Sequence, residues 1–248
     1  MSNIKFDFKD ENYVVTGASS GMGRQTALEL ARSGARVLAI ARSEDKLRDL
    51  QAECGDRIFI APLDVCDSER MEEAVRDFVA VNGKLHGGVH AAGITDITPL
   101  KSYDKIQASK IMEINFWAGM DFIQLITKRA FSSEQASFVL FSSVEAVYSP
   151  KGMFVYSASK AAVDSAMRSI SKEIARRGQR VNSIMPGWVE TGMTDKLGSI
   201  SNKSEILSNE ILGSGAPQDV TGMVLFLLSD RARWITGTSI AVDGGFLA

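Results

Sequence analysis

Short runs of β-branched and aliphatic residues alternate along this chain with longer segments that have the period of amphipathic helices. This alternation is typical of repeated βαβ units, whose strands pair in parallel and whose helices cover both faces of the sheet. Several runs are almost unbroken apolar sequences, such as FVLF at 138–141, as expected of strands that are buried on both faces. The pattern predicts seven strands, at 13–16, 36–41, 57–62, 88–91, 138–142, 180–185 and 239–242.

The segments between these strands contain no long linker, no solenoid repeat and no low-complexity tract. We therefore expect a single α/β domain of the Rossmann type over residues 1–248, with helices on both faces of a seven-stranded parallel sheet. One stretch, 191–215, is polar, rich in Ser and Asn, and bounded by Gly192 and Gly215. Such a segment late in an α/β chain is predicted to be a substrate lid rather than part of the core.

Composition excludes several kinds of partner and location. Lys and Arg number 28 against 30 Asp and Glu, so no charge excess indicates nucleic acid or an anionic membrane as a partner. The two cysteines, Cys54 and Cys66, are too few for a disulfide scaffold and indicate reduced thiols in a cytoplasmic protein. The first ten residues are too charged for a signal peptide, and no apolar run reaches the roughly 18 residues of a membrane span. We expect no metal site.

A glycine-rich turn, TGASSGMG at 16–23, follows the first predicted strand and opens the first helix. In a dinucleotide site Gly17 would permit the tight turn, Gly21 would let the backbone approach the pyrophosphate, and Gly23 would let helix and sheet pack closely. The helix N-terminus would add oriented N–H groups and a partial positive charge. The alternative is a glycine-rich turn without a ligand, which the strand before it and the helix after it disfavour. Cofactor contacts are also expected from Ser19, Ser20 and Met22.

The end of the second predicted strand favours NADP(H) over NAD(H) as the cofactor. An NAD-selective site is expected to place there a carboxylate that binds the adenosine ribose hydroxyls, but this chain has Ala41. Arg42 follows, and its planar guanidinium suits bidentate binding of a phosphate, with Ser43 as an additional donor. The alternative is a solvated arginine that merely begins the next helix.

Tyr156 and Lys160 are four residues apart in a predicted helix at 155–177, so both project from one face of it. Chemistry at a carbonyl beside a nicotinamide needs a group that gives a proton to the forming alkoxide or takes it back in reverse. A tyrosine with its usual pKa of about 10 is a poor base at pH 7. A nearby ammonium and the positive ring of the oxidised cofactor would lower that pKa. The alternative is an ordinary amphipathic pair.

Ser143 strengthens this prediction because it lies just past a predicted strand, thirteen residues before Tyr156. Ligands of a doubly wound sheet bind beyond the carboxyl ends of the strands, so Ser143 could donate to the substrate carbonyl oxygen. Ser142 is the alternative hydroxyl, and strand alternation sends the two side chains to opposite faces. Glu145, two residues further on, could meet a polar substrate or simply face water.

With these motifs the chain resembles the short-chain dehydrogenase/reductase family over nearly its whole length, from Tyr13 to Phe246. The family signature T-G-x-x-x-G-x-G matches 16–23, and the family's spacing of Ser to Tyr selects Ser143 over Ser142. Further matches are AAG at 91–93, PGWVET at 186–191, TGT at 236–238 and DGG at 243–245.

The resemblance implies roles for further residues. Asn115 would support a proton relay through a backbone kink and a bound water, although in isolation it fits a helix-interior Asn that bonds locally. Asp64 would lie near the adenine amino group with the Val65 backbone beside it, although Asp64 fits a helix-capping acid nearly as well. The resemblance also implies a homotetramer or homodimer, packed through the long helices after Asn115 and after Tyr156. The remaining implied cofactor contacts are Ala92, Gly93, Tyr156, Lys160, Pro186, Gly187, Val189 and Thr191.

One departure from the family pattern lies after the fourth predicted strand. Where the family usually has Asn-Asn-Ala-Gly, this chain has HAAG at 90–93. The missing Asn removes side-chain hydrogen bonds that brace the central strand, so the departure bears on local stability more than on chemistry. His90 could act as a catalytic base, but a histidine satisfied by hydrogen bonds at a strand end is favoured.

These patterns predict an NADP(H)-dependent oxidoreductase that reduces a ketone to a secondary alcohol, or catalyses the reverse, with Tyr156 as general acid or base. The substrate stays open among 3-oxoacyl thioesters, sugars, steroids and small carbonyl compounds. One alternative is a catalytically silent NADP(H)-binding regulator on the same fold, which the four intact catalytic positions oppose. Another is a sugar-nucleotide epimerase or dehydratase of the extended branch, which usually has a different glycine spacing and a longer substrate domain.

Overall fold

A computed structural model describes residues 4–194 and 211–248 of the chain. Its sheet has seven strands in the order β3-β2-β1-β4-β5-β6-β7, and every neighbouring pair is parallel. The predicted Rossmann-type parallel sheet is therefore confirmed. The strands are β1 (Asn12–Thr16), β2 (Arg36–Ala41), β3 (Ile58–Pro62), β4 (Leu85–His90), β5 (Ser132–Phe141), β6 (Arg180–Pro186) and β7 (Ser239–Val242).

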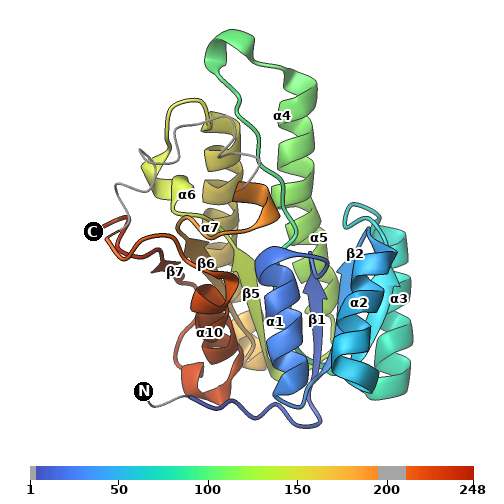
Figure 1. Cartoon of the computed structure of the whole chain (residues 1–248). Helices are drawn as coiled ribbons and strands as arrows, with labels where there is room; N and C mark the ends of the chain where they lie inside the picture. The colour runs from blue at the N-terminus through green and yellow to red at the C-terminus, as the bar shows by residue number, and fades with distance from the viewer. Residues whose placement is uncertain (1–3, 195–210) are drawn as a thin grey trace.

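Helices cover both faces of this sheet (Figure 1). On one face lie α1 (Gly21–Arg32), α2 (Glu44–Cys54) and α10 (Pro217–Leu228), and on the other lie α3 (Ser68–Asn82), α5 (Ala118–Ile126) and α7 (Phe154–Ile174). The remaining helical segments are α4 (Lys105–Met112), α6 (Glu145–Tyr148), a π-helical turn (Glu113–Trp117) and the 3₁₀ turns Gly55–Arg57, Leu100–Ser102, Ala175–Arg177 and Asp230–Ala232. No helix in the described part of the chain has both the length and the apolar character to cross a membrane.

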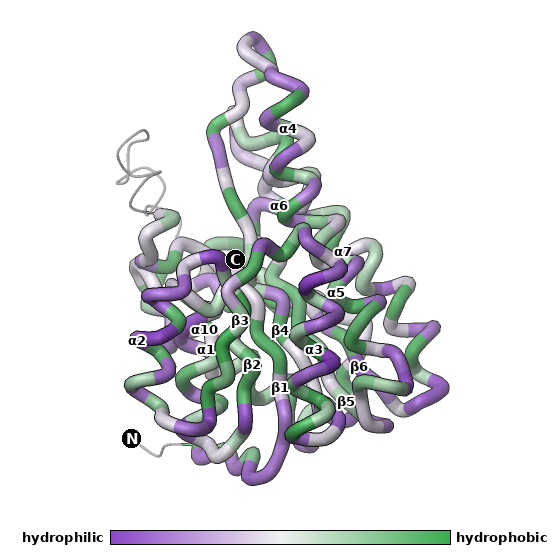
Figure 2. Tube along the Cα trace, turned by 90° about the vertical axis from the view of Figure 1, so that its right-hand side faces the viewer, coloured by the Kyte–Doolittle hydropathy of each residue, from purple (hydrophilic) through white to green (hydrophobic). Residues whose placement is uncertain are grey.

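Two apolar cores explain why the strands are nearly unbroken apolar runs. In β1, Val15 packs into the core under α1 and α10, whereas Val14 packs into the core on the α3, α5 and α7 side. In β5, likewise, Val139 packs into the core under α1 and α10, and Phe138 packs into the core on the α3, α5 and α7 side. Successive side chains of a strand point to opposite faces, so a strand that is covered on both sides must be apolar at every position. In Figure 2 the hydrophobic colour follows the strands through the middle of the molecule.

The strand order reverses beside β1, because β2 and β3 lie on one side of it and β4 to β7 on the other. In an open parallel sheet this switch point leaves a crevice beyond the carboxyl ends of the strands, where ligands bind. The glycine turn after β1 and the loops after β4 and β5 meet at this edge. Above it, α4 extends away from the sheet (Figures 1 and 2).

Strand β4 begins at Leu85, three residues before the predicted start. Two glycines near its start weaken the strand signal, yet the packing requires them. A Cβ on Gly87 would lie 2.2 Å from the Ser137 carbonyl oxygen, and one on Gly88 would lie 2.7 Å from Ile126 Cδ1. The absence of side chains therefore lets β5 and α5 approach β4 closely.

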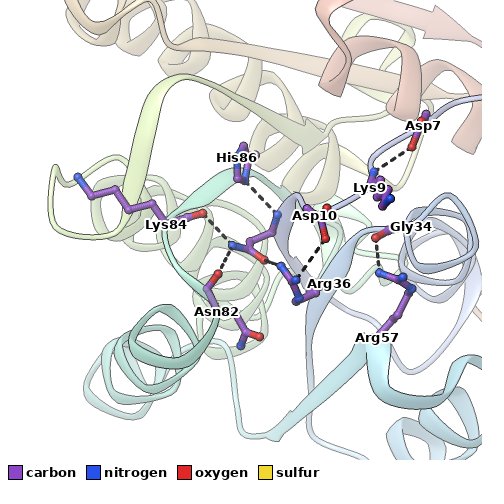
Figure 3. A network of polar contacts seen from close by, with 10 residues as sticks. Asp7, Lys9, Asp10, Gly34, Arg36, Arg57, Asn82, Lys84 and His86 are labelled. Atoms are coloured by element: carbon purple, nitrogen blue, oxygen red, sulfur yellow. Dashed lines mark hydrogen bonds and ion pairs between the residues drawn. The ribbon is translucent and has the colours of Figure 1, made fainter.

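At the opposite edge, polar contacts hold the amino end of β1 (Figure 3). The Asn12 amide side chain donates to the carbonyls of Asn82 and Lys84 at 2.8 and 3.1 Å, and its backbone N–H donates to His86 Nδ1 at 3.0 Å. Arg36 donates to Asn12 Oδ1 at 3.4 Å. These contacts tie β1 to β2 and β4 at the end of the sheet remote from the glycine turn.

Candidate active site

Backbone crowding explains the glycines of the turn after β1. Gly17 has φ +69°, and a Cβ there would lie 2.8 Å from the carbonyl carbon of Ala91 and the nitrogen of Ala92. A Cβ on Gly23 would lie 2.5 Å from the Gly17 carbonyl oxygen, so helix α1 packs against the turn itself. Ser20 precedes the helix and makes no capping hydrogen bond with its side chain, which leaves the first N–H groups of α1 directed at the crevice.

A cleft of about 230 Å³ runs along this turn and brings together most of the predicted cofactor residues. It is formed by the turn after β1, the ends of β2 and β3, the loop after β4, and residues 191–193. Ser43 is an exception, since it precedes α2 and does not line the cleft. The predicted residues that line it are Gly17, Ser19, Ser20, Gly21, Met22, Gly23, Arg42, Asp64, Val65, Ala92, Gly93 and Thr191.

Arg42 and Asp64 lie together at the mouth of this cleft. Arg42 Nη1 is 4.0 Å from Asp64 Oδ2, and the arginine side chain is 71% exposed. The capping alternative for Asp64 is wrong, because Asp67 caps α3 by accepting from the Arg70 N–H at 3.1 Å. Asp64 instead accepts from the Cys66 N–H at 3.0 Å and shapes the loop after β3. An exposed guanidinium with one long ion pair is free to reorient toward an anion at the cleft mouth.

A second cavity, of about 470 Å³, adjoins the first and shares Met22, Thr191 and Met193 with it. Ser143 at the end of β5 and Tyr156 from α7 both line it, as do Pro186, Gly187 and Val189 after β6. The rest of its wall is largely apolar. Besides the residues already named, the wall contains Thr95, Ile97, Ser142, Glu145, Tyr148, Pro150, Lys151, Met153, Trp188, Thr194 and Phe246.

The two candidate hydroxyls after β5 have different partners. Ser142 Oγ donates to Asp164 Oδ2 at 2.8 Å, and Ser183 Oγ donates to the other carboxylate oxygen at 2.5 Å. Ser142 is therefore held in a buried network between β5, β6 and α7. Ser143 Oγ accepts from the Glu145 N–H at 3.2 Å and lies against Tyr156 at the cavity. This geometry favours Ser143 over Ser142 as the hydroxyl that would meet a substrate.

Tyr156 and Lys160 are both buried, and the pKa of Tyr156 is raised rather than lowered as we expected. Burial raises the pKa of Tyr156 well above 10, and the charge of Glu145 adds to the rise, while the Ser143 hydrogen bond lowers it. Lys160 Nζ lies 5.7 Å from the tyrosine ring centroid and donates to the Phe141 carbonyl at 2.8 Å. Lys160 therefore does not lower the Tyr156 pKa in this arrangement, contrary to our expectation.

Burial lowers the pKa of Lys160 to about 8. The negative charges of Asp164 and Glu145 raise this pKa and so oppose part of the effect of burial. The ammonium consequently stays mostly protonated at neutral pH, although it is surrounded by protein. A Cβ on Gly93 would lie 3.5 Å from Lys160 Nζ, so the lysine lies directly under the loop after β4. This position places the ammonium between the cofactor cleft and the tyrosine.

Asn115 lies in the π-helical turn between α4 and α5, and it is almost completely buried. Its Oδ1 accepts from the Ile94 N–H at 2.8 Å, and its Nδ2 donates to the Ile94 carbonyl at 2.9 Å and to Ser159 Oγ at 3.1 Å. The helix irregularity that the family resemblance implied is therefore present. The alternative of purely local bonding is wrong, because the partners lie 21 and 44 residues away.

His90 is buried at the end of β4, where its Nδ1 lies 3.0 Å from Thr16 Oγ1. This contact joins β4 to β1 and replaces part of the bracing expected from an asparagine. Burial, together with the charge of Lys160, lowers the His90 pKa to about 3, so the ring is neutral at pH 7. A backbone hydrogen bond with Ile114 opposes this lowering of the pKa. The expected satisfied histidine is realised at Nδ1, whereas Nε2 has no partner of full hydrogen-bond geometry in the described part of the chain. His90 lines neither cavity, which disfavours a role as catalytic base.

Glu145 lines the larger cavity. The sequence had left open whether this side chain meets a polar substrate or faces water. Its Oε2 is buried and has no hydrogen-bond partner among residues 4–194 and 211–248. Burial raises the pKa of the carboxyl to about 7, and the positive charge of Lys160 opposes the rise. The sequence signal for this residue was its position two residues after Ser143, at the edge of the sheet where ligands bind.

The predicted lid and the expected absence of metal can be examined only in the described residues. Of the segment 191–215, residues 191–194 and 211–215 are described, and 195–210 lies outside the described residues. Gly215 pairs with Val189, and Thr191, Met193 and Thr194 line the larger cavity. Within the described ranges no group of three or more His, Cys, Asp or Glu residues could hold a metal ion.

Comparisons with known proteins agree with this geometry. The model of a family described as Enoyl-(Acyl carrier protein) reductase matches residues 17–247. A 3-oxoacyl-(acyl-carrier-protein) reductase of Thermotoga maritima is 31% identical over 237 residues, which cover 94% of this chain and 96% of that protein. L-xylulose reductase of Caenorhabditis elegans is 34% identical over 245 residues, which cover 97% of each chain.

Solved structures are similar over almost the whole chain. A short-chain dehydrogenase/reductase of Brucella melitensis, titled a glucose/ribitol dehydrogenase, has a TM-score of 0.92 at 28% identity, and the match covers 98% of this chain and 99% of the other. A dehydrogenase/reductase of Sinorhizobium meliloti has a TM-score of 0.92 at 28% identity, with 98% of each chain covered.

Proposed function

The chain belongs to the short-chain dehydrogenase/reductase family of oxidoreductases, and on this premise we propose that it reduces a ketone to a secondary alcohol, or catalyses the reverse, with NADP(H). The observation that carries the proposal is the junction of the two cavities. Ser143 and Tyr156 face the larger cavity where it meets the glycine-lined cleft, so a carbonyl held by them would lie beside a cofactor bound along that cleft.

The residues of the cleft fit a dinucleotide. Gly17 has no room for a Cβ, and the turn directs the N-terminus of α1 into the cleft, as close approach of a pyrophosphate requires. Preference for NADP(H) is supported by Ala41 and by Arg42, whose exposed guanidinium lies at the mouth of the cleft. NADPH, when bound, supplies the hydride.

The chain's own groups would handle the oxygen and its proton. Ser143 Oγ would donate a hydrogen bond to the carbonyl oxygen, and the Tyr156 hydroxyl would transfer its proton to that oxygen as it becomes an alkoxide. Lys160 would stabilise the phenolate that remains, and its ammonium would bind the nicotinamide ribose. Asn115 would act as a positioning residue, since it ties the loop after β4 to α7.

Self-association through helices is also part of this proposal. The family resemblance implicates the helices after Asn115 and after Tyr156. Exposed apolar side chains occur where these helices begin: Trp117, on the π-helical turn that leads into α5, and Phe154, at the start of α7, are 52% and 41% exposed, and Ile106 on the preceding α4 is 83% exposed. Exposed apolar residues of this kind favour a helix-mediated homodimer or homotetramer. Sedimentation equilibrium of the purified chain would refute this if it gave the monomer mass.

The test of the activity is a panel of a 3-oxoacyl thioester, a ketose, a steroid ketone and a small ketone, each assayed with NADPH and with NADH. We expect oxidation of NADPH by at least one ketone. Tyr156→Phe should still bind NADPH but lose at least about 100-fold in turnover, because it cannot donate the proton. Tyr103→Phe, an exposed tyrosine outside both cavities, is the matched control.

If NADPH binds but no ketone oxidises it, the chain is a silent binder, and the proposal fails. If Tyr156→Phe turns over at the wild-type rate, Tyr156 has no part in the reaction.

A further inference from the structure

Two buried polar atoms, on residues that line the larger cavity, lack hydrogen-bond partners in the described part of the chain. They are Oε2 of Glu145 and Oγ1 of Thr95. Buried polar atoms in native proteins are nearly always paired, so each exception requires an explanation. The other unpaired atoms of this kind lie on residues that do not line the cavity: His90, Ser157, Arg177 and Gln179.

Glu145 and Thr95 reach the cavity from neighbouring strands. Thr95 follows β4, Glu145 follows β5, and these two strands pair in parallel, so both loops lie at the same edge of the sheet. The backbone of Glu145 donates to Ser143 Oγ at 3.2 Å, which places this residue beside the hydroxyl that would hold the carbonyl oxygen. Glu145 is therefore close to the reacting end of a substrate, and Thr95 lines the same cavity from the neighbouring loop.

The chemistry of the pair identifies the missing partner. The positive charge of Lys160 already acts on Glu145, and its pKa of about 7 leaves the carboxyl partly protonated at neutral pH, so it can accept or donate. The Thr95 hydroxyl has the same dual capacity. A hydroxyl group, itself donor and acceptor, complements both. Beside its keto group a 3-oxoacyl thioester offers only the acceptor oxygen of the thioester carbonyl, so it could accept from one of these two groups but could donate to neither.

We propose that Glu145 and Thr95 bind a hydroxyl group adjacent to the reacting carbonyl, so that this chain acts on hydroxyketones in preference to 3-oxoacyl thioesters. The proposal rests on the proposed carbonyl reduction and names its substrate class. The apolar part of the cavity wall, which includes Met153 and Phe246, would contact the carbon skeleton of the substrate.

The experiment compares 2-hydroxyacetophenone with propiophenone, which has a methyl group in place of the hydroxyl. We measure kcat/KM for NADPH oxidation with each ketone, and with a 3-oxobutyryl thioester, for the wild-type chain, Glu145→Met, Glu145→Gln and Thr95→Val. Glu173→Met, an exposed glutamate of α7, is the matched control. Dissociation constants of both aromatic ketones from the complex with NADP⁺, measured by calorimetry, report binding without turnover.

We expect the wild-type chain to prefer the hydroxyketone over its isostere by about 10- to 100-fold, as for one hydrogen bond to a buried partner. Glu145→Met should reduce this ratio at least about tenfold, Thr95→Val should reduce it less, and Glu145→Gln should retain part of it because an amide can both donate and accept. The ratio should not change in Glu173→Met. The same order should appear in the dissociation constants.

Equal ratios in the wild-type chain and Glu145→Met, in turnover and in binding, would overturn the proposal while leaving carbonyl reduction intact. A thioester that surpasses the hydroxyketone would overturn it as well. Oxidation of NADPH by none of the ketones would instead refute the proposed function, and equal binding of the two aromatic ketones would then refute the hydroxyl site separately.

Discussion

Replacing Glu145 by glutamine should stabilise the ligand-free protein, and by an amount that depends on pH. Burial raises the pKa of this carboxyl to about 7 from its ordinary value of 4.5. The folded state therefore holds the proton more tightly than the unfolded state does. As pH rises, the unfolded chain releases the proton first, and the folded chain is left with a buried carboxylate whose Oε2 has no partner in the described part of the chain.

The size of the effect follows from the two pKa values. The gap corresponds to a loss of up to about 3 kcal/mol in the free energy of unfolding, since each pKa unit is about 1.4 kcal/mol. This loss is absent below pH 4.5, develops between pH 4.5 and about 7, and is complete above about pH 7. Glutamine resembles the protonated carboxyl in size and polarity and does not titrate, so Glu145→Gln escapes the loss.

The assay is thermal unfolding of the wild-type chain and Glu145→Gln from about pH 5 to about pH 8, without cofactor. The two midpoints should differ least at the acid end, where most of the loss has not yet developed. At the alkaline end Glu145→Gln should unfold about 6 °C or more higher, because a chain of this size shifts by about 2–4 °C for each kcal/mol. Glu173→Gln, an exposed glutamate, should show no such divergence. A difference that is constant with pH, or a less stable variant at about pH 8, would refute the reasoning.

Two further predictions concern the cofactor cleft. Arg42→Ala should lower the preference for NADPH over NADH in kcat/KM by about 1.5–3 kcal/mol, the value of a hydrogen bond to a charged group, and an unchanged preference would remove Arg42 from the phosphate site. Gly23→Ala would place a Cβ 2.5 Å from the Gly17 carbonyl oxygen, so the turn must shift. We expect at least tenfold weaker NADPH binding by this variant in a fluorescence titration. The control is Gly222→Ala, whose Cβ would meet nothing within 4 Å and which should bind NADPH normally.

The parts of the site that could be predicted from sequence are those that depend on the backbone. The alternation of strands and helices places every residue that directly follows a strand at one edge of the sheet. That rule supported the predictions for the glycine turn, Arg42 and Ser143, the family resemblance added Gly93, and the structure brings each of them to one of the two adjoining cavities. The family's spacing then distinguished Ser143 from Ser142, a choice that agrees with the bond of Ser142 to Asp164.

The parts that could not be predicted depend on where side-chain atoms point and how deeply they lie. The Tyr156 pKa rises because the side chain is buried, with the charge of Glu145 adding to the rise, and helical spacing shows nothing of burial. By sequence Asp64 is a plausible helix cap, and only hydrogen-bond geometry shows that Asp67 caps α3 instead. Glu145 lies in a loop, where no period tells whether a side chain faces water or a cavity.

The buried site bears on the direction of the proposed reaction. Burial shifts the pKa of Tyr156 and Glu145 upward and that of Lys160 downward, so it favours the neutral form of all three groups. Tyr156 is then protonated at neutral pH, which is the form that donates to a carbonyl oxygen. Alcohol oxidation would need the phenolate, and Lys160 could stabilise it only after its Nζ turned away from the Phe141 carbonyl, to which it donates in the ligand-free chain. At neutral pH the protonated tyrosine is therefore the form present to donate, and the phenolate becomes available only as pH rises or as a further positive charge reaches the ring.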